Sequence, residues 1–339
     1  IGANTPTPEA NGSDASNLGS FVQIGHGGQN STLPTSGAGT FIMPGGTNVN
    51  NIVPDGSMAG DITVTAGGTY LDPTNASTPI GILIRAGNRR WQHAMIGHGG
   101  DSHNAVNATT QTPSFGGSAN LPFGSPTLAA STGFNGNIRV VADKGSVIAT
   151  GGDSFRADRV WGYGFNFVRV GHGGDTVRGN KGGNITVTAG QGVGATAGDI
   201  RFTSGRMQRD HSQLGHGGYD SGGSILGAAN TAEIIVTARG DVSFVSPESG
   251  DKDALGLSAD YAYWWFSNAS PAGTPQTGQP TYWETANRWT MLGHGGRSSI
   301  TVMPNRQNIT VTSGTGDASN ADGNASTGGV KFVAGDMEQ

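Results

Sequence analysis

The chain has 339 residues, of which 60 are glycine and only 13% are Asp, Glu, Lys or Arg, and its formal net charge is −5. Glycine costs about 1 kcal/mol per helical position, and Ser, Thr and Asn compete for backbone hydrogen bonds, so this composition disfavours helices. The chain has no cysteine, no run of about 18 apolar residues and no basic cluster, which leaves disulfides, a membrane span and nucleic-acid binding without support. The hydrophobic residues, 34% of the chain, fall in alternating runs. We therefore expect an all-β fold with a buried core.

In chain order, the first predicted element is a short strand that leads into a Gly-His-Gly-Gly block, as in "NFVRVGHGG" (166–174). The chain contains five such blocks, each preceded by a branched aliphatic residue. They hold five of the eight histidines, which are His26, His98, His172, His216 and His294.

A second predicted strand follows each block and alternates with the period of two that is typical of β-structure. Its five copies are "GDITVTAGG" (60–68), "GNIRVVADKG" (136–145), "GNITVTAGQG" (183–192), "AEIIVTARG" (232–240) and "QNITVTSGTG" (307–316). Ile and Val at alternate positions predict the buried face, and most of the threonines then lie on the other face.

A third predicted strand closes each repeat. Its copies are "IGILIRAG" (80–87), "GSVIATGG" (145–152), "GDIRFTSG" (198–205), "GDVSFVSPESG" (240–250) and "GGVKFVAGD" (328–336). Three short strands per repeat, punctuated by glycine, predict a parallel β-solenoid of about five long three-strand coils with variable loop insertions. We expect this single repetitive domain to span residues 1–339.

The alternative fold is a β-propeller, in which each repeat would be a four-stranded blade. It is disfavoured because each repeat contains three strand signals, and because the spacings between the block histidines are 72, 74, 44 and 78 residues. A solenoid tolerates such variation, since insertions leave the stacked faces undisturbed.

The sequence pattern of strands such as "GNITVTAG" and "GDIRFTSG" resembles that of the parallel β-helix in secreted adhesins of the filamentous-haemagglutinin type and related autotransporter passengers. The resemblance covers most of the chain in patches, but the long repeats and the Gly-His-Gly-Gly block depart from that family. It implies an exported surface or filament protein without catalysis. The chain begins at Ile1 rather than at Met, which fits a processed segment.

The two ends of the chain are in phase with the repeat. If residue 1 of a second copy followed Gln339, His26 of that copy would come 71 residues after His294. This predicts either a segment of a longer array or a protomer that stacks head to tail on itself, because open solenoid ends present unpaired strand edges.

The repeated histidines favour a structural interpretation. One block per coil would place equivalent imidazoles about 4.8 Å apart, where neutral rings can stack or bond to the backbone. We therefore predict a neutral histidine ladder whose stability falls as the pH drops through about 6.5.

The alternative is a transition-metal site, but the residue after the block varies among Gln29, Asp101, Asp175, Tyr219 and Arg297, so no ligand set recurs. A calcium roll would need blocks about every nine residues. We expect no bound metal and no cofactor.

A second recurring feature precedes three of the blocks as "NRRW" (88–91), "DRVW" (158–161) and "NRW" (287–289). It predicts a corner of stacked cation–π pairs, with a ligand groove as the alternative. The residues of this predicted Arg/Trp corner are Arg89, Trp91, Arg159, Trp161, Arg288 and Trp289.

The longest insertion, residues 246–287, concentrates aromatic residues. It is the candidate contact surface for a surface glycan or a neighbouring filament, and the alternative is a lid packed on the solenoid. The candidate residues are Tyr261, Tyr263, Trp264, Trp265, Tyr282 and Trp283.

No catalytic constellation is evident in the sequence. Asp251, Asp253, Asp260 and Glu284 lie near the aromatic insertion, but no spacing marks two of them as the carboxylate pair that glycoside hydrolysis needs. We expect an extracellular structural or adhesive repeat protein that is not an enzyme. The alternatives are a carbohydrate-binding or carbohydrate-cleaving β-helix that uses residues 246–287, and a metal-binding histidine scaffold.

Overall fold

The computed structural model describes residues 21–29, 58–72, 75–87, 92–101, 133–152, 166–175, 177, 180–195, 198–205, 210–219, 221–224, 232–246, 289–296, 300–302, 307–314 and 328–333. Every regular element in these ranges is a β-strand, and no helix occurs among them. None of the described residues belongs to a helix long and apolar enough to cross a membrane. We number the repeat units 1 to 5 by the block histidine that each contains, in chain order.

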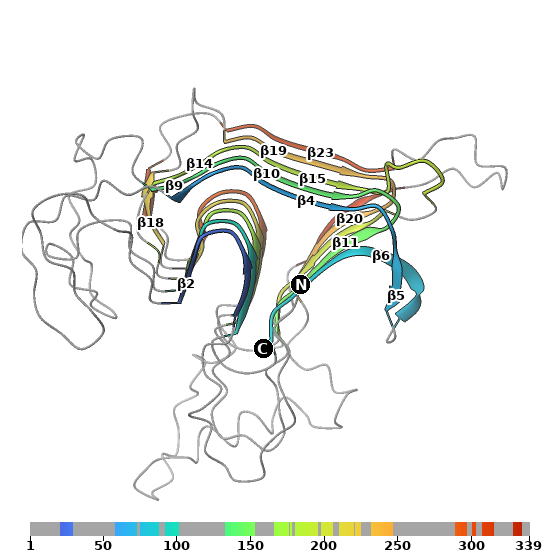
Figure 1. Ribbon diagram of the computed structural model, residues 1–339, viewed down its shortest axis with the longest axis horizontal. Coiled ribbons are helices and arrows are strands. Elements are labelled where there is room, and N and C mark those ends of the chain that lie inside the picture. Colours follow the sequence, from blue (N-terminus) through green and yellow to red (C-terminus); the bar gives the residue numbers. More distant parts are fainter. Residues whose placement is uncertain are drawn as a thin grey trace, which may run out of the picture.

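The first main layer, which we call the Ile/Val sheet, contains one strand from every unit. Its strands are β4 (Ile62–Ala66), β10 (Ile138–Ala142), β15 (Ile185–Ala189), β19 (Ile234–Ala238) and β23 (Ile309–Thr312). All neighbours pair in parallel without a register shift, so that Ile138 lies opposite both Ile62 and Ile185. Figure 1 shows these strands stacked as the upper layer.

A second layer, the Phe sheet, stacks the closing strand of each unit. It consists of β6 (Asn75–Arg85), β11 (Ser146–Thr150), β16 (Ile200–Thr203), β20 (Val242–Val245) and β24 (Val330–Val333), all parallel, with β5 (Tyr70–Asp72) added antiparallel to β6. Phe244 stacks on Phe202 and on Phe332, with ring centroids 5.1 Å and 5.2 Å apart.

The third layer, the arch sheet, contains the strands that approach the histidine blocks. Its members are β1 (Phe21–Ile24), β7 (His93–Ile96), β12 (Phe167–Val170), β17 (His211–Leu214) and β21 (Trp289–Leu292). After each strand the chain bends at a Gly-His pair and returns on the far side, so that successive units form nested arches beneath the Ile/Val sheet (Figure 1).

Short strands complete the stack. The returning limbs of the first three arches are β2 (Gly27–Gln29), β8 (Gly99–Asp101) and β13 (Gly173–Asp175), and three more strands, β3 (Met58–Ala59), β9 (Gly133–Asn135) and β14 (Asn180–Gly182), precede the Ile/Val sheet. A parallel pair, β18 (Gly222–Ser224) and β22 (Ile300–Val302), links the last two units.

The hydrophobic core lies between the three main layers and follows the predicted alternation. Ile185, Val187 and Ala189 of β15 are fully buried, whereas Thr186 and Thr188 between them are half-buried on the outer face. Ile96 and Val170 of the arch sheet join the same core cluster as Phe202 of the Phe sheet.

The structure confirms the all-β prediction and the parallel stacking of equivalent strands from successive units. The antiparallel blades of a propeller are excluded for the described sheets, in which only β5 and β6 pair antiparallel. The returning limbs such as "GGD" (173–175) are not predictable from the sequence, because three residues with two glycines carry no alternation.

Candidate functional site

The bend of each arch requires glycine for two reasons. Gly171 and Gly173, on either side of His172, have φ values of 150° and 119°, which side-chain-bearing residues avoid. A Cβ atom on Gly171 would also overlap the backbone carbonyl oxygen of Gly215 in the next unit. The block therefore keeps its glycines because neighbouring arches touch backbone to backbone.

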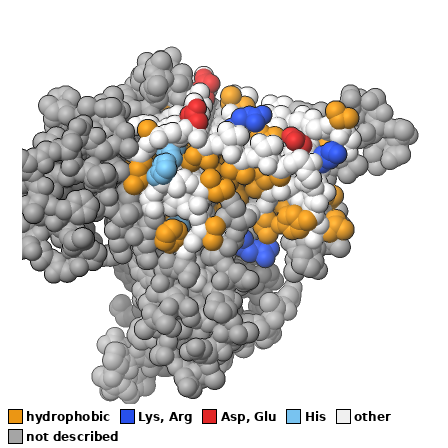
Figure 2. All heavy atoms as spheres, viewed as in Figure 1, with side chains coloured by type: hydrophobic (Ala, Val, Ile, Leu, Met, Phe, Trp, Pro, Cys, Tyr) orange, Lys and Arg blue, Asp and Glu red, His pale blue; other side chains and the backbone are white. Residues whose placement is uncertain are grey.

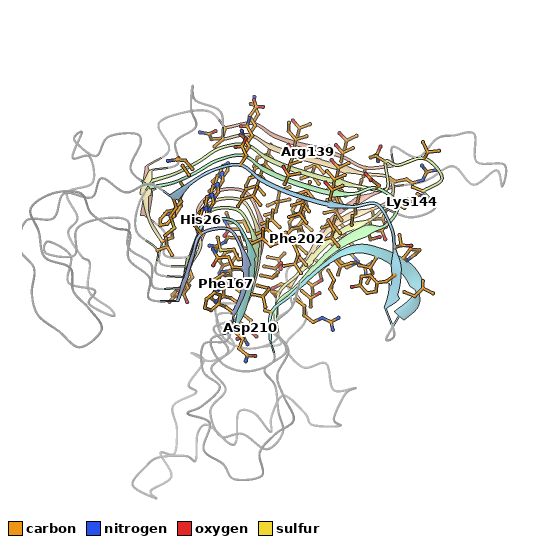
Figure 3. The ribbon with its side chains drawn as sticks, in the orientation of Figure 1. His26, Arg139, Lys144, Phe167, Phe202 and Asp210 are labelled. Atoms are coloured by element: carbon orange, nitrogen blue, oxygen red, sulfur yellow. The ribbon has the colours of Figure 1, made fainter. Side chains whose placement is uncertain are left out.

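The five block histidines form one continuous column of stacked rings at the bends of the arches. Successive ring centroids lie 5.0, 4.8, 4.9 and 5.0 Å apart, and no two successive planes differ by more than 8°. Figure 3 shows His26, the first of them, at the top of the arch next to the Ile/Val sheet. We call this set the histidine column: His26, His98, His172, His216 and His294.

Each ring after the first also accepts a hydrogen bond from the unit before it. The backbone N–H groups of His26, His98, His172 and His216 each donate to Nδ1 of the following histidine, over 3.0, 2.9, 3.0 and 3.1 Å. An Nδ1 that accepts from an N–H carries no proton, so the hydrogen of each neutral ring is on Nε2.

On its other side, each acceptor ring donates to the strand that leads into the Ile/Val sheet. Nε2 of His98, His172 and His216 lies 3.0, 2.9 and 2.8 Å from the carbonyl oxygens of Gly60, Gly136 and Gly183, and Nε2 of His294 lies 2.7 Å from that of Ala232. One imidazole thus connects the backbone of two arches with that of the Ile/Val sheet. This connection is why the block contains a histidine.

Burial keeps these rings neutral. Desolvation lowers the pKa of His172 from 6.5 to about 3 and holds the pKa of His216 well below its usual value. The pKa values of His98 and His294 are lowered as well, chiefly by desolvation. A proton on Nδ1 would also break the bond from the neighbouring backbone N–H, so geometry and desolvation favour the same state.

The described residues offer no evident metal site. No group of three His, Cys, Asp or Glu side chains among them is arranged to hold a metal ion. In His98, His172 and His216 both ring nitrogens are already hydrogen-bonded, and the Nδ1 lone pair that a metal would need accepts a backbone N–H.

A second column, five residues before the first, lies on the inner side of the arches. It consists of Phe21, His93, Phe167, His211 and Trp289, whose successive ring centroids lie 5.1, 4.5, 5.1 and 4.3 Å apart. Burial and then the nearby Arg169 guanidinium lower the pKa of His93 to about 3. We call this set the mixed aromatic column. A ring at the same offset in every unit was the signal that sequence analysis did not use.

Between the two columns, the arch is filled by a polar side chain in three units and by Met95 and Met291 in the other two. Nε2 of Gln213 donates to the carbonyl oxygens of Gly293 and Gly295, each over 3.0 Å, and Gln23 does the same to Gly97 over 2.9 Å. In the middle unit the equivalent residue is Arg169, whose guanidinium is fully buried and donates to the carbonyl oxygen of Gly217.

The Arg169 charge is held in a dry environment. Its Nη2 lies 3.2 Å from Nε2 of His211, and its guanidinium carbon lies 5.3 Å from the centre of the Phe167 ring. Desolvation lowers the pKa of Arg169 to about 9, and the attraction of buried Asp175 opposes that shift.

Of the predicted Arg/Trp corner, only Trp289 lies in a described range. It stacks on His211, and its equivalents in register are His93 and Phe167. Trp91 and Trp161 precede those two residues in the sequence, so the tryptophans of the three motifs do not occupy one position. Arg89, Trp91, Arg159, Trp161 and Arg288 lie outside the described residues, as do Tyr261, Tyr263, Trp264, Trp265, Tyr282 and Trp283 of the aromatic insertion.

Side-chain oxygens form a further ladder at the start of the Ile/Val sheet. Oδ1 of Asp61 accepts the backbone N–H of Asn137, Oδ1 of Asn137 accepts that of Asn184, and Oδ1 of Asn184 accepts that of Glu233, over 2.8 to 3.0 Å. This ladder, like the histidine column, connects one unit with the next.

No family model matches the chain, and no curated protein and no solved structure matches it.

Proposed function

We propose that the chain is an extracellular structural or adhesive repeat protein, folded as a β-solenoid of about five three-strand coils. It forms, or belongs to, a head-to-tail stacked filament or a giant surface fibre, and it catalyses no reaction. Its work is mechanical. The loops between the strands would supply the chemistry of the surface.

One observation carries this proposal: the same columns run without a break through all five units. The histidine column, the mixed aromatic column and the Ile/Val sheet each include one member from every unit. A protein built around a reaction departs from its repeat where the chemistry occurs, because binding and catalytic groups are placed at particular loops. Here the buried polar groups serve the contact between units.

Stiffness along the stack supports the mechanical role. Neighbouring units are joined at the same time by parallel backbone pairing in three sheets, by the bond from a backbone N–H to the next Nδ1, and by ring stacking. The sequence pattern of the strands, which resembles that of secreted β-helical adhesins, supports an exported location.

The test is electron microscopy of native material together with immunogold labelling of intact source cells. We expect straight fibres or a surface layer, with the label outside the cell. Label confined to the cell interior, on isolated particles, would overturn the proposal.

A further inference from the structure

Threonine side chains form a grid on the outer face of the Ile/Val sheet. Because side chains alternate along a strand, the second and fourth residues of each of its strands face away from the core. The row of second residues consists of Thr63, Arg139, Thr186, Ile235 and Thr310. The row of fourth residues consists of Thr65, Val141, Thr188, Thr237 and Thr312. Threonine thus occupies seven of the ten positions, including both positions in units 1, 3 and 5.

The grid is regular in both directions. The five strands pair without a register shift, so each row runs straight along the stack at the spacing of paired strands, about 4.8 Å. Within a strand the two outer side chains are two residues apart, which corresponds to about 6.6 Å. The threonines therefore stand on a nearly rectangular lattice.

Successive units are hardly rotated relative to one another, which keeps this lattice flat along the stack. Neighbouring strands of ordinary sheets are rotated by about 20–25°. Here the ring planes of neighbouring block histidines differ by only 7°, 5°, 2° and 8°. The strands of the Ile/Val sheet accordingly lie over one another in Figure 1. A face of this kind can match another flat lattice over all five units.

The grid is accessible and carries a single charge. Thr63, Thr65, Thr310 and Thr312 are exposed, and the threonines of units 3 and 4 are half-buried. None of the seven hydroxyls hydrogen-bonds another described group. Arg139 is the only ionisable residue in the two rows, and Figure 3 shows it on the outer side of the sheet. In Figure 2, white atoms, which are backbone and uncharged polar side chains, make up much of the upper edge over these strands.

This pattern suits an ordered layer of water. Each threonine offers a hydroxyl, which donates and accepts hydrogen bonds, beside a methyl group that restricts the orientation of neighbouring waters. On the prism face of hexagonal ice, oxygen atoms repeat at two perpendicular distances, one close to the spacing of paired strands and the other close to twice the rise per residue of a strand. Rows of threonine hydroxyls can therefore stand in for rows of lattice oxygens.

We infer that the outer face of the Ile/Val sheet binds ice. Waters held on the two rows join the crystal lattice, and the five units act together because the grid is flat. Val141 and Ile235 keep a branched methyl group in the rows, so Arg139 is the one residue that interrupts the grid. The activity belongs to the single folded chain, so it goes beyond the proposed function and gives an adhesive protein a solid to which it adheres.

The test measures how the full-length chain partitions into slowly growing ice, with inhibition of ice recrystallisation as a second readout. Thr188→Lys places a long charged side chain in the middle unit of the grid. The matched control is Thr203→Lys, because Thr203 is also half-buried but lies on the outer face of the Phe sheet. We expect the unmodified chain and the control to be enriched in the ice, and Thr188→Lys to be several-fold less abundant there.

A second variant should gain activity, which a failure to fold cannot imitate. Arg139→Thr removes the charge and makes the first row continuous from Thr63 to Thr186, so the fraction in the ice should rise. Its control is Arg201→Thr on the outer face of the Phe sheet, which should leave that fraction unchanged. Circular dichroism and thermal melting show whether each variant is folded.

An unmodified chain that is excluded from ice as completely as serum albumin would overturn the inference. So would a folded Thr188→Lys variant that partitions like the unmodified chain, or an Arg139→Thr variant that partitions no better. Fibre formation and the location of the native protein are measured by electron microscopy and immunogold labelling, so either proposal can fail while the other stands.

Discussion

The backbone N–H of His98 donates to Nδ1 of His172 over 2.9 Å, and Nε2 of the same ring lies 2.9 Å from the carbonyl oxygen of Gly136. A single neutral imidazole thereby satisfies buried polar groups of two chain segments and stacks on the rings above and below it. Both ring nitrogens are already hydrogen-bonded, so a proton added at Nδ1 would have no hydrogen-bond acceptor. The stability of the fold should therefore depend on pH.

Acid should destabilise the protein in the range where free imidazoles titrate. A histidine whose pKa is lowered on folding binds fewer protons in the native than in the unfolded state, so its contribution is complete above pH 6.5 and is lost as the pH falls toward the folded pKa. For His172, with a folded pKa of about 3, lowering the pH from 7 to 5 should remove about 2 kcal/mol of unfolding free energy. His93 and His216 should add losses of the same sign.

Urea denaturation followed by circular dichroism between about pH 8 and pH 5 measures this loss, and most carboxylates remain ionised throughout that range. An unfolding free energy that does not change across the range would contradict the neutral column.

Substitutions within the column should separate its two hydrogen bonds. His172→Ala leaves the N–H of His98 and the carbonyl of Gly136 without partners, at about 1–3 kcal/mol each, and also removes stacking. His172→Asn can keep an acceptor near the position of Nδ1, so its loss should be smaller, and its unfolding free energy should depend less on pH than that of the unmodified chain.

The matched control is His26→Ala. His26 belongs to the same motif, but its ring is exposed, and its backbone N–H still reaches His98 after the substitution. We expect a loss below about 1 kcal/mol for this variant. Equal losses for His26→Ala and His172→Ala would show that the ring contributes through something other than the two buried hydrogen bonds.

Much of the fold could be predicted from the sequence, because a buried strand face repeats with a period of two. Ile185 and Val187 mark that face without any knowledge of their partners. The spacing of the histidine column also follows from strand geometry, and the structure has both the stacking and the backbone bonds that were considered as alternatives.

The interior of the arch could not be predicted in the same way. Phe167 and Arg169 face the inside of a bend whose returning limb is mostly glycine, so no alternation on the far side indicates what they meet. Similarity of residue type was misleading too, because Trp289 stands in register with His211, His93 and Phe167 and not with another tryptophan. The sequence signal for that column is a ring of any type five residues before each block histidine, and the register between units shows that these rings lie opposite one another.

Alanine substitutions at three glycines distinguish the stability cost of backbone strain from that of steric overlap between units. An alanine at Gly171 would combine a φ of 150° with overlap of the Gly215 carbonyl, whereas Gly60 has a φ of 146° and open space around its Cβ direction. Gly68 has open space and no positive φ. We expect Gly68→Ala to change stability by less than about 0.5 kcal/mol, Gly60→Ala to cost about 1–3 kcal/mol, and Gly171→Ala to cost more than either.

Thermal melting of the three alanine variants ranks them directly. If Gly60→Ala and Gly171→Ala were equally destabilising, the close approach of neighbouring arches would contribute nothing beyond the backbone conformation.

Arg169 and Asp175 should be energetically coupled. Both are buried in the same arch, and the attraction of Asp175 raises the pKa of the Arg169 guanidinium against a larger desolvation effect. Removing one of two interacting buried charges costs about 3–5 kcal/mol, since the other charge stays in a dry environment. Arg169→Gln and Asp175→Gln should each be destabilising by about that amount.

The double variant should be destabilising by clearly less than the sum, because it reproduces the pair Gln23 and Gln29 that the first unit carries at the same positions. A double-mutant cycle in urea measures the coupling, for which we expect about 2 kcal/mol or more. Additive losses would mean that Arg169 is held by the Gly217 carbonyl and the rings of the mixed aromatic column, with no contribution from the carboxylate.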